Sequence, residues 1–490
     1  MTQILSLPWL ELAVAVAIVG SIAIPRMRNP YSAWQFYIVF SGVVFLCTAV
    51  AWLCFHQQGD RAGQTYSIQP WLFGRIVFAL DELTAPLLPL LSLIYFLTGL
   101  VTARTRMQRN TFASSLVSEA FRLLTFSTMV SPDVPGSAWI FIGLLAANTI
   151  PPYFDLVRHG KSGRVYLLHM GLFVTLLVVG WALVEYASTE GGNSRSLPWW
   201  AILPLLAAVV VRSGIVPMHL WIVDLFENAG FGHALLFVLP LSGVLIAIRL
   251  VNPIAPDWAA QILEFGALIT AVYSAGMAAT QRDARRFFAH VFISHSALVL
   301  VGLDLVEDHH LEVICVTGAL ALWFSVMLTI GSFGLIMRAL EARFGRLSLT
   351  GFRGLYDHSP TLAICFLLTA LASVGFPGTL GFISIEILVD GTIGPSPWIA
   401  VVVAILAALN GIAVVRAYLL LFTGTRHAST VSLGIVTRER LAVSVLIVLI
   451  FGGGMFPQAF VSSRYRAAES VLKQREAHIS PGSKLPVSNQ

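Results

Sequence analysis

Charge is scarce in this 490-residue chain, because Asp, Glu, Lys and Arg together make up 11% of it while 57% is hydrophobic. Soluble globular domains carry roughly 25% charged residues, so the composition excludes that class. No glycine-rich nucleotide loop and no soluble domain of useful size are present. Four cysteines lie inside apolar runs, with no CxxC pair and no Cys/His spacing that suits a metal: Cys47, Cys54, Cys315 and Cys365. The sequence therefore predicts a polytopic membrane protein with no cofactor, no metal and no redox centre of its own.

Apolar runs of about 20 residues, the length that crosses a bilayer as a helix, recur along the whole chain. The first run is followed directly by a second one of spanning length, so we expect it to be retained rather than cleaved as a signal peptide. The predicted fold class is all-α, a polytopic membrane protein with about fourteen transmembrane helices, at 8–25, 35–55, 76–102, 111–131, 137–157, 165–187, 197–216, 231–251, 258–279, 287–305, 311–337, 360–389, 398–423 and 439–460.

Basic residues concentrate in alternate loops. The loops after spans 1, 3, 5, 9, 11 and 13 are rich in arginine, and the positive-inside rule places them in the cytoplasm, with both termini outside. The polar, basic tail from Ser462 to Gln490 favours the opposite orientation. We expect that tail to be disordered or to lie flat on a partner.

The seventh apolar run combines a charge with a helix breaker. Arg212 is followed by Pro217 and His219 within a stretch that should lie in the bilayer. Proline interrupts the helical hydrogen bonds, and a charge beside a broken helix at membrane depth suggests an ion route. The alternative is a kinked packing helix whose arginine reaches toward a lipid headgroup.

This run resembles the broken seventh helix of the antiporter-like membrane subunits shared by respiratory complex I and Mrp-type sodium/proton antiporters. That helix has a lysine, then proline five residues on, histidine seven on and tryptophan nine on, which Arg212, Pro217, His219 and Trp221 match in spacing. Three further blocks are similar to the family: the run into its tenth helix, its broken twelfth helix around Pro377 and, more weakly, the entry to its third helix, at 281–295, 375–382 and 80–83.

The resemblance implies two inverted five-helix repeats, each with a broken helix, inside a larger assembly of membrane subunits. On that basis the chain divides into N-terminal helices at 1–110, a first repeat at 111–252, a second repeat at 253–424, and a last helix with a polar tail at 425–490.

Members of this family are expected to move protons along a midplane row of Glu and Lys, and that row is depleted in this chain. Arg212 alone keeps a charge in register, and a guanidinium stays protonated where a desolvated lysine can release its proton. The other positions of the row fall on apolar residues: Ala146, Leu241, Val326, Ile330 and Ile385.

Five residues remain as candidates for an ion path: Glu119, Arg212, His219, His295 and Glu386. We expect Glu119 to pair with Arg212, or with Arg122 one helical turn away as a structural ion pair. The two candidate histidines could pass protons or be packed core residues. Packing is favoured for His169, His233 and His290, and solvation at span ends for Asp155, Glu185, Asp304 and Asp390.

Three functions follow from these features. The first is a membrane subunit of a complex I-like or Mrp-like assembly, coupled to proton or cation translocation, as a possible part of an NADH:quinone oxidoreductase-type translocase in a bacterial-type cytoplasmic membrane. The second is a subunit of an energy-coupled inorganic-carbon uptake complex with a soluble, carbonic-anhydrase-like partner, since Arg212 suits an anion. The third is a scaffold that kept the fold and lost transport. None of the three involves nucleic acid.

Overall fold

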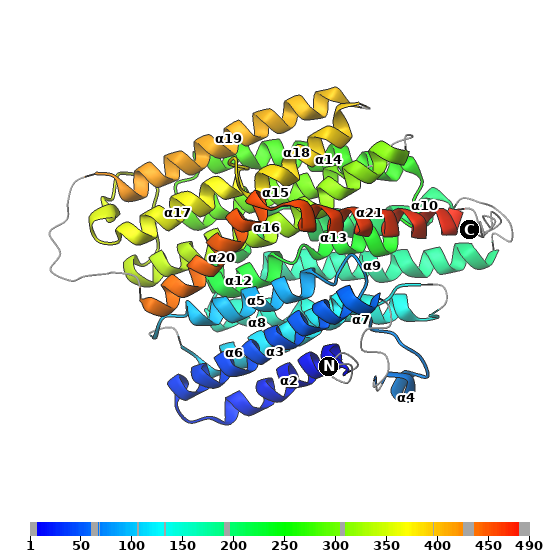
Figure 1. Ribbon diagram of the computed structural model, residues 1–490, viewed down its shortest axis with the longest axis horizontal. Helices are drawn as coiled ribbons and strands as arrows, with labels where there is room; N and C mark the ends of the chain where they lie inside the picture. Colours follow the sequence, from blue (N-terminus) through cyan, green and yellow to red (C-terminus); the bar gives the residue numbers. More distant parts are fainter. Residues whose placement is uncertain are drawn as a thin grey trace.

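The computed structural model describes residues 7–59, 67, 69–104, 107–131, 134–190, 197–303, 309–394, 396–424 and 436–479. Regular structure in these residues is helical, apart from two isolated β-bridges that join Phe78 to Thr128 and Asp283 to Ser348. Most of the longer helices lie side by side along the long axis of the molecule (Figure 1). The predicted all-α class is confirmed.

The N-terminal helices pack against one another and against the start of the next region. Asn29 caps the second of them, because its side chain accepts a hydrogen bond of 2.9 Å from the Tyr31 amide, and Pro30 takes the first helical position. The elements are α2 (Trp9–Ala23), the 3₁₀ turn η1 (Ile24–Arg26), α3 (Pro30–Gln58), the short α4 (Gln69–Phe73) and α5 (Leu87–Leu100).

The region predicted as the first repeat is built largely from broken helices. Gly214, in a left-handed conformation with φ 69°, ends α10 three residues before Pro217. Pro240 and Leu241 separate α12 from α13, and Leu241 has φ 49°. The elements are α6 (Arg109–Ser127), α7 (Ser137–Asn148), α8 (Ile150–Arg158), α9 (Arg164–Glu190), α10 (Trp199–Ser213), α11 (Leu220–Asn228), α12 (Phe231–Val238), α13 (Ser242–Ile246) and the π-helical η4 (Ala247–Val251).

The second region has longer helices and one pronounced break. Gly375 and Gly378, with φ of 84° and 82°, interrupt the predicted twelfth span around Pro377, and Thr379 then caps α18. The elements are α14 (Asp257–Thr280), α15 (Ala284–Val301), α16 (His309–Phe344), the 3₁₀ turn η5 (Leu355–Asp357), α17 (Pro360–Ser373), α18 (Leu380–Ile393) and α19 (Pro397–Phe422).

The C-terminal segment differs from the prediction. Residues 458–479, expected to be the end of the last span followed by a disordered or surface-lying tail, form the helix α21 (Gln458–Ile479), bent by 80° from α20 (Thr437–Met455). Helix α21 packs along α16, and its Arg464 is buried because it donates to the carbonyls of Glu82 and Leu83 at 3.0 Å each. Its Arg475 binds Asp257 at 2.8 Å. Internal partners for Arg464 and Arg475 therefore help to explain why residues 458–479 form a packed helix.

Within the described residues, eight helices are long and apolar enough to cross a membrane, or nine when α20 and α21 count as one bent span. Each of the fourteen predicted ranges contains at least one helix, but several are short halves of broken helices. The number fourteen and the division into repeats therefore stay predictions. The starts of α3, α9 and α20, which follow arginine-rich loops, lie toward the same end of the molecule, at the left in Figure 1.

Candidate functional site: a polar row in the first repeat

Arg212 lies at the last turn of α10 and is only 6% exposed. Its guanidinium donates to the Ser242 hydroxyl at 3.3 Å and sits over the rings of Phe237 and Trp221, at 4.3 and 5.3 Å from their centroids. No carboxylate among the described residues forms an ion pair with Arg212. The expected pairing with Glu119 is therefore wrong.

Glu119 of α6 contacts α3 and not Arg212. It is fully buried and accepts a 3.4 Å hydrogen bond from the Ser41 hydroxyl of α3. Arg122, one turn later, donates instead to the Tyr95 hydroxyl and to the Phe237 carbonyl, at 3.0 Å each. The alternative Glu119 to Arg122 ion pair is also not formed, because the two side chains leave the helix toward different neighbours.

The two candidate histidines have different surroundings. His219 follows the break between α10 and α11 and lies 5.4 Å from the ring of Tyr273 and 6.1 Å from that of His290, measured between centroids. His295 is buried in α15, and its Nδ1 contacts the Val291 carbonyl of the same helix at 2.8 Å. Only His219 therefore has a titratable neighbour whose ring it contacts.

Glu386 does not face the interior of the chain. It lies on an exposed face of α18, after the Pro377 break, and Asp390 one turn later is exposed as well. Lipid solvates carboxylates poorly, so these two exposed side chains do not suit a face that contacts lipid.

The best-connected polar cluster involves two residues whose importance the sequence does not reveal. Asp155, expected to be solvated at a span end, is 4% exposed and lies 3.3 Å from Nδ1 of His233. It also accepts the Gly230 amide at 2.8 Å and lies 3.7 Å from the surface residue His159. His233 in turn contacts the Ser115 hydroxyl through Nε2 at 3.2 Å. The only sequence signal is a carboxylate and a histidine in spans of the same repeat.

A water-sized cavity of about 10 Å³ continues this cluster inward. Its polar lining residues are His233, Ser115, Ser118 and Tyr95. The Tyr95 hydroxyl donates to Ser118 at 3.2 Å and accepts from Arg122. Because Arg122 and Arg212 both contact the Phe237 ring, we define the polar row as Asp155, His233, Ser115, Ser118, Tyr95, Arg122, Arg212 and Ser242.

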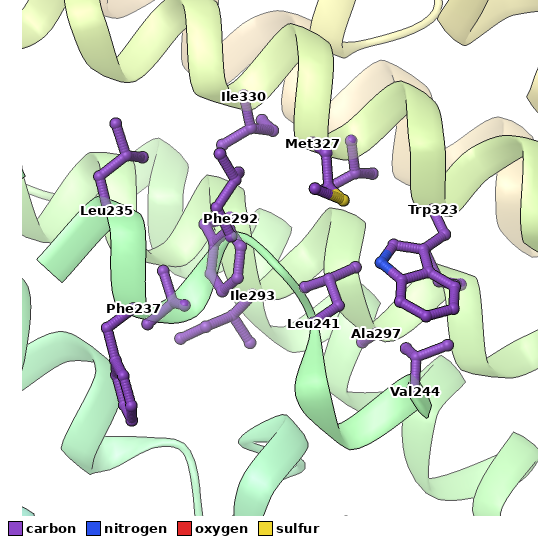
Figure 2. Close-up of a cluster of buried hydrophobic side chains, with 14 of the residues drawn as sticks. Leu235, Phe237, Leu241, Val244, Phe292, Ile293, Ala297, Trp323, Met327 and Ile330 are labelled. Atoms are coloured by element: carbon purple, nitrogen blue, oxygen red, sulfur yellow. The ribbon is translucent and has the colours of Figure 1, made fainter. Parts of the chain in front are cut away.

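Part of the contact between the two predicted repeats is apolar. Leu241, Val326 and Ile330, where the resemblance would place titratable groups, are buried in the main hydrophobic core. Figure 2 shows this region, in which Leu241 lies on the link between α12 and α13, with Phe292 and Met327 nearby. The labelled side chains include only hydrocarbon, thioether and indole groups: Leu235, Phe237, Leu241, Val244, Phe292, Ile293, Ala297, Trp323, Met327 and Ile330. The polar row therefore does not continue into the second half along this line.

The segment that resembles the run into the family's tenth helix has a structural role. Asp283 caps α15 by accepting the Arg285 amide at 2.9 Å, and it also binds the Arg346 guanidinium at 2.8 Å. This contact with Asp283, outside the spans, raises the pKa of Arg346 above its ordinary value. Arg285 reaches Glu341 at 2.6 Å. The motif thus fastens α15 to the end of α16.

No group of three or more His, Cys, Asp or Glu side chains in the described part of the chain is arranged to hold a metal ion. The four cysteines form no disulfide and are buried or half-buried.

Comparisons with known proteins agree with this architecture. Subunit 13 of NADH-quinone oxidoreductase from Thermus thermophilus is 25% identical over 424 residues, covering 82% of this chain and 86% of the relative. A chain of respiratory complex I from the same organism superposes with a TM-score of 0.81 at 23% identity, covering 95% and 99% of the two chains. A chain of the Mrp complex from Dietzia sp. DQ12-45-1b superposes with a TM-score of 0.77 at 15% identity, covering 98% of each chain.

The transmembrane family described as NADH:quinone oxidoreductase/Mrp antiporter matches residues 154–410, more than half of the sequence. The protein is an integral membrane protein that belongs to this family.

Proposed function

We propose that this protein is a membrane subunit of a complex I-like or Mrp-like assembly, coupled to proton or cation translocation, in a bacterial-type cytoplasmic membrane. The observation that carries the proposal is the hydrogen-bonded chain Asp155, His233 and Ser115 inside the first predicted repeat. It supplies titratable groups in a chain whose expected Glu and Lys positions are apolar.

The cluster of Asp155, His233 and Ser115 can take up and release a proton by a simple rearrangement. The Ser115 hydroxyl lies 3.0 Å from the Thr111 carbonyl and 3.2 Å from Nε2 of His233. When Ser115 donates to the carbonyl, Nε2 must carry a hydrogen to bond with the serine, and Nδ1 donates to Asp155, so the ring is an imidazolium. When the hydroxyl turns toward Nε2, the ring is neutral. Rotation of one hydroxyl therefore accompanies proton loading.

The cluster has a route to the surface. His159, whose side chain is 47% exposed, lies beside Asp155 at the end of α8, next to a loop predicted to be cytoplasmic. At its inner end the row reaches Arg122 and Arg212, which stay charged and do not relay protons. Instead, a positive charge at His233 repels these two guanidinium groups. Because Arg212 lies at the end of α10, this repulsion acts on the break between α10 and α11.

Partners are expected because two acidic side chains of α18, Glu386 and Asp390, are exposed. We propose that other membrane subunits cover this face and that redox chemistry, where the assembly performs it, belongs to a soluble partner. The related proteins do not favour inorganic-carbon uptake with a carbonic-anhydrase-like partner, nor a scaffold without transport.

The test uses native membranes. A tagged chain is recovered in mild detergent, its partners are identified by mass spectrometry, and proton and sodium uptake are measured in vesicles with and without the gene. The proposal expects co-purifying membrane subunits and uptake that is lost without the gene and restored by it. A stable isolated monomer, together with uptake that does not depend on the gene, contradicts it.

A further inference from the structure

The first predicted repeat holds more buried positive charge than its own carboxylates neutralise. Arg122 and Arg212 both contact the ring of Phe237, and neither forms an ion pair with a carboxylate in the described ranges. Nearby carboxylates are engaged elsewhere, since Asp81 binds Arg249, Asp155 binds His233 and Glu119 accepts a hydrogen bond from Ser41. Two cations that share one aromatic ring repel each other in a medium of low dielectric constant, so this region attracts a counter-ion.

A cavity lies beside one of these two arginines. Its volume is about 20 Å³, and the residues lining it include Arg212, Ser213, Ser242, Gly243 and Ser296. No aspartate or glutamate is among its described lining residues. A space of 10–15 Å³ holds one water molecule, so this cavity accommodates a particle somewhat larger than water.

Three polar side chains at the cavity have hydrogens to donate, namely those of Arg212, Ser213 and Ser242, whereas the Ser296 hydroxyl donates to the Ile293 carbonyl. The Ser213 hydroxyl oxygen is buried with no hydrogen-bond partner among the described residues. Ser242 accepts from Arg212, so its own hydrogen is free to donate. A guanidinium and two hydroxyl donors around one space form a site for an acceptor that carries negative charge.

The backbone limits the size of that acceptor. A Cβ at Gly243 would lie 2.1 Å from the Ser213 hydroxyl oxygen, so the start of α13 approaches the end of α10 as closely as glycine allows. Because the space cannot extend in this direction, a compact anion fits better than a bulky one.

We propose that the cavity beside Arg212 binds a small monovalent anion of about the size of chloride. The site lies where the breaks of α10/α11 and α12/α13 meet α15 of the second region, which contributes Phe292 and Ser296 to the lining. The bound ion neutralises Arg212 and joins the two halves of the molecule. This inference concerns binding and goes beyond the proposed transport function.

The test measures binding on the full chain in its native assembly, without transport. Thermal stability and ³⁶Cl⁻ binding are followed at constant ionic strength while chloride replaces gluconate, which is too bulky for the cavity. The proposal expects saturable chloride binding and a melting temperature that rises with chloride. Ser213→Ala should weaken chloride binding about tenfold, because one donor to the ion is lost. Arg212→Gln should abolish it.

Ser274→Ala is the matched control, because the Ser274 hydroxyl is also buried without a hydrogen-bond partner among the described residues but does not line the cavity. Its chloride response should equal that of the wild type. Where Arg212→Gln fails to fold, Ser213→Ala and Ser242→Ala decide the question. A wild type without saturable chloride binding, or serine variants that bind chloride as tightly as Ser274→Ala, overturns the proposal while leaving the translocation test unaffected.

Discussion

Buried arginines in this protein have three kinds of partner. Arg249 binds the carboxylate of Asp81, Arg464 binds backbone carbonyls, and Arg122 and Arg212 rely on hydroxyl and carbonyl oxygens and on the ring of Phe237. Only the first kind cancels charge. Removing one member of such a pair leaves an uncompensated charge, whereas an arginine without a carboxylate has no such partner to lose.

Double-mutant cycles separate these cases. Asp81→Asn and Arg249→Met should each cost about 3–5 kcal/mol of stability, and the double variant should cost clearly less than their sum. Glu119→Gln and Arg212→Met should be additive to within about 0.5 kcal/mol, because these side chains bind different partners. Unfolding free energies measured in membranes provide the test. Rescue in the Glu119 and Arg212 double variant would show that the two charges meet.

The sequence identifies individual residues of the site better than their partners. Spacing alone places Arg212 at a helix break, which the structure confirms. It does not reveal that Asp155 is buried, because its partners Gly230 and His233 come from a segment about 75 residues later in the chain. Nor does it show that α6 turns Glu119 toward α3. Such contacts depend on helix rotation, which periodicity hardly constrains when most faces of a helix are apolar.

At the scale of elements, helix breaks and close packing are coupled. The end of α20 lies against the break between α17 and α18, so that a Cβ at Gly454 would be 2.4 Å from the Gly378 carbonyl oxygen. A Cβ at Gly452, two residues earlier, would meet no atom of another described element within 4 Å. The resemblance to the family's broken twelfth helix predicts the break around Pro377, but not the helix that packs on it.

These two glycines provide a matched pair of substitutions. Gly454→Ala should destabilise the protein by about 1–3 kcal/mol, because backbone atoms must move to admit the methyl group. Gly452→Ala should be neutral or stabilise by up to about 1 kcal/mol through its higher helix propensity. Melting temperatures in detergent compare the two variants. Equal effects would mean that α20 does not dock on the break.

At the scale of the whole molecule, the fold class and the helix order could be predicted because apolar runs of spanning length dominate the sequence. The C-terminal helix α21 could not, because its polar composition resembles a solvated tail and its stability comes from contacts with α16, Asp257 and the carbonyls before α5. Arg475 binds the Asp257 carboxylate and Arg464 binds backbone carbonyls, so these two basic residues have internal partners and argue less against an external C-terminus.

Cysteine labelling tests this orientation. Arg28→Cys and Arg158→Cys occupy exposed positions in loops predicted to be cytoplasmic, and Lys473→Cys replaces a 73% exposed side chain on α21. An impermeant thiol reagent applied to intact cells should label only Lys473→Cys, because the native cysteines are buried or half-buried. Labelling of Arg28→Cys from outside would reverse the orientation.

The most direct test of the account compares two histidines, one half-buried and one buried, in the intact assembly. His233 belongs to the polar row, whereas His295 contacts the Val291 carbonyl of its own helix. Proton uptake by vesicles should fall about tenfold or more with His233→Gln, because the titrating group of the loading cluster is lost, and should stay near the wild-type rate with His295→Gln. Immunoblots of the purified assembly confirm that both variants are incorporated. Wild-type uptake with His233→Gln in a complete assembly would contradict the central claim that the first repeat carries the proton-loading site.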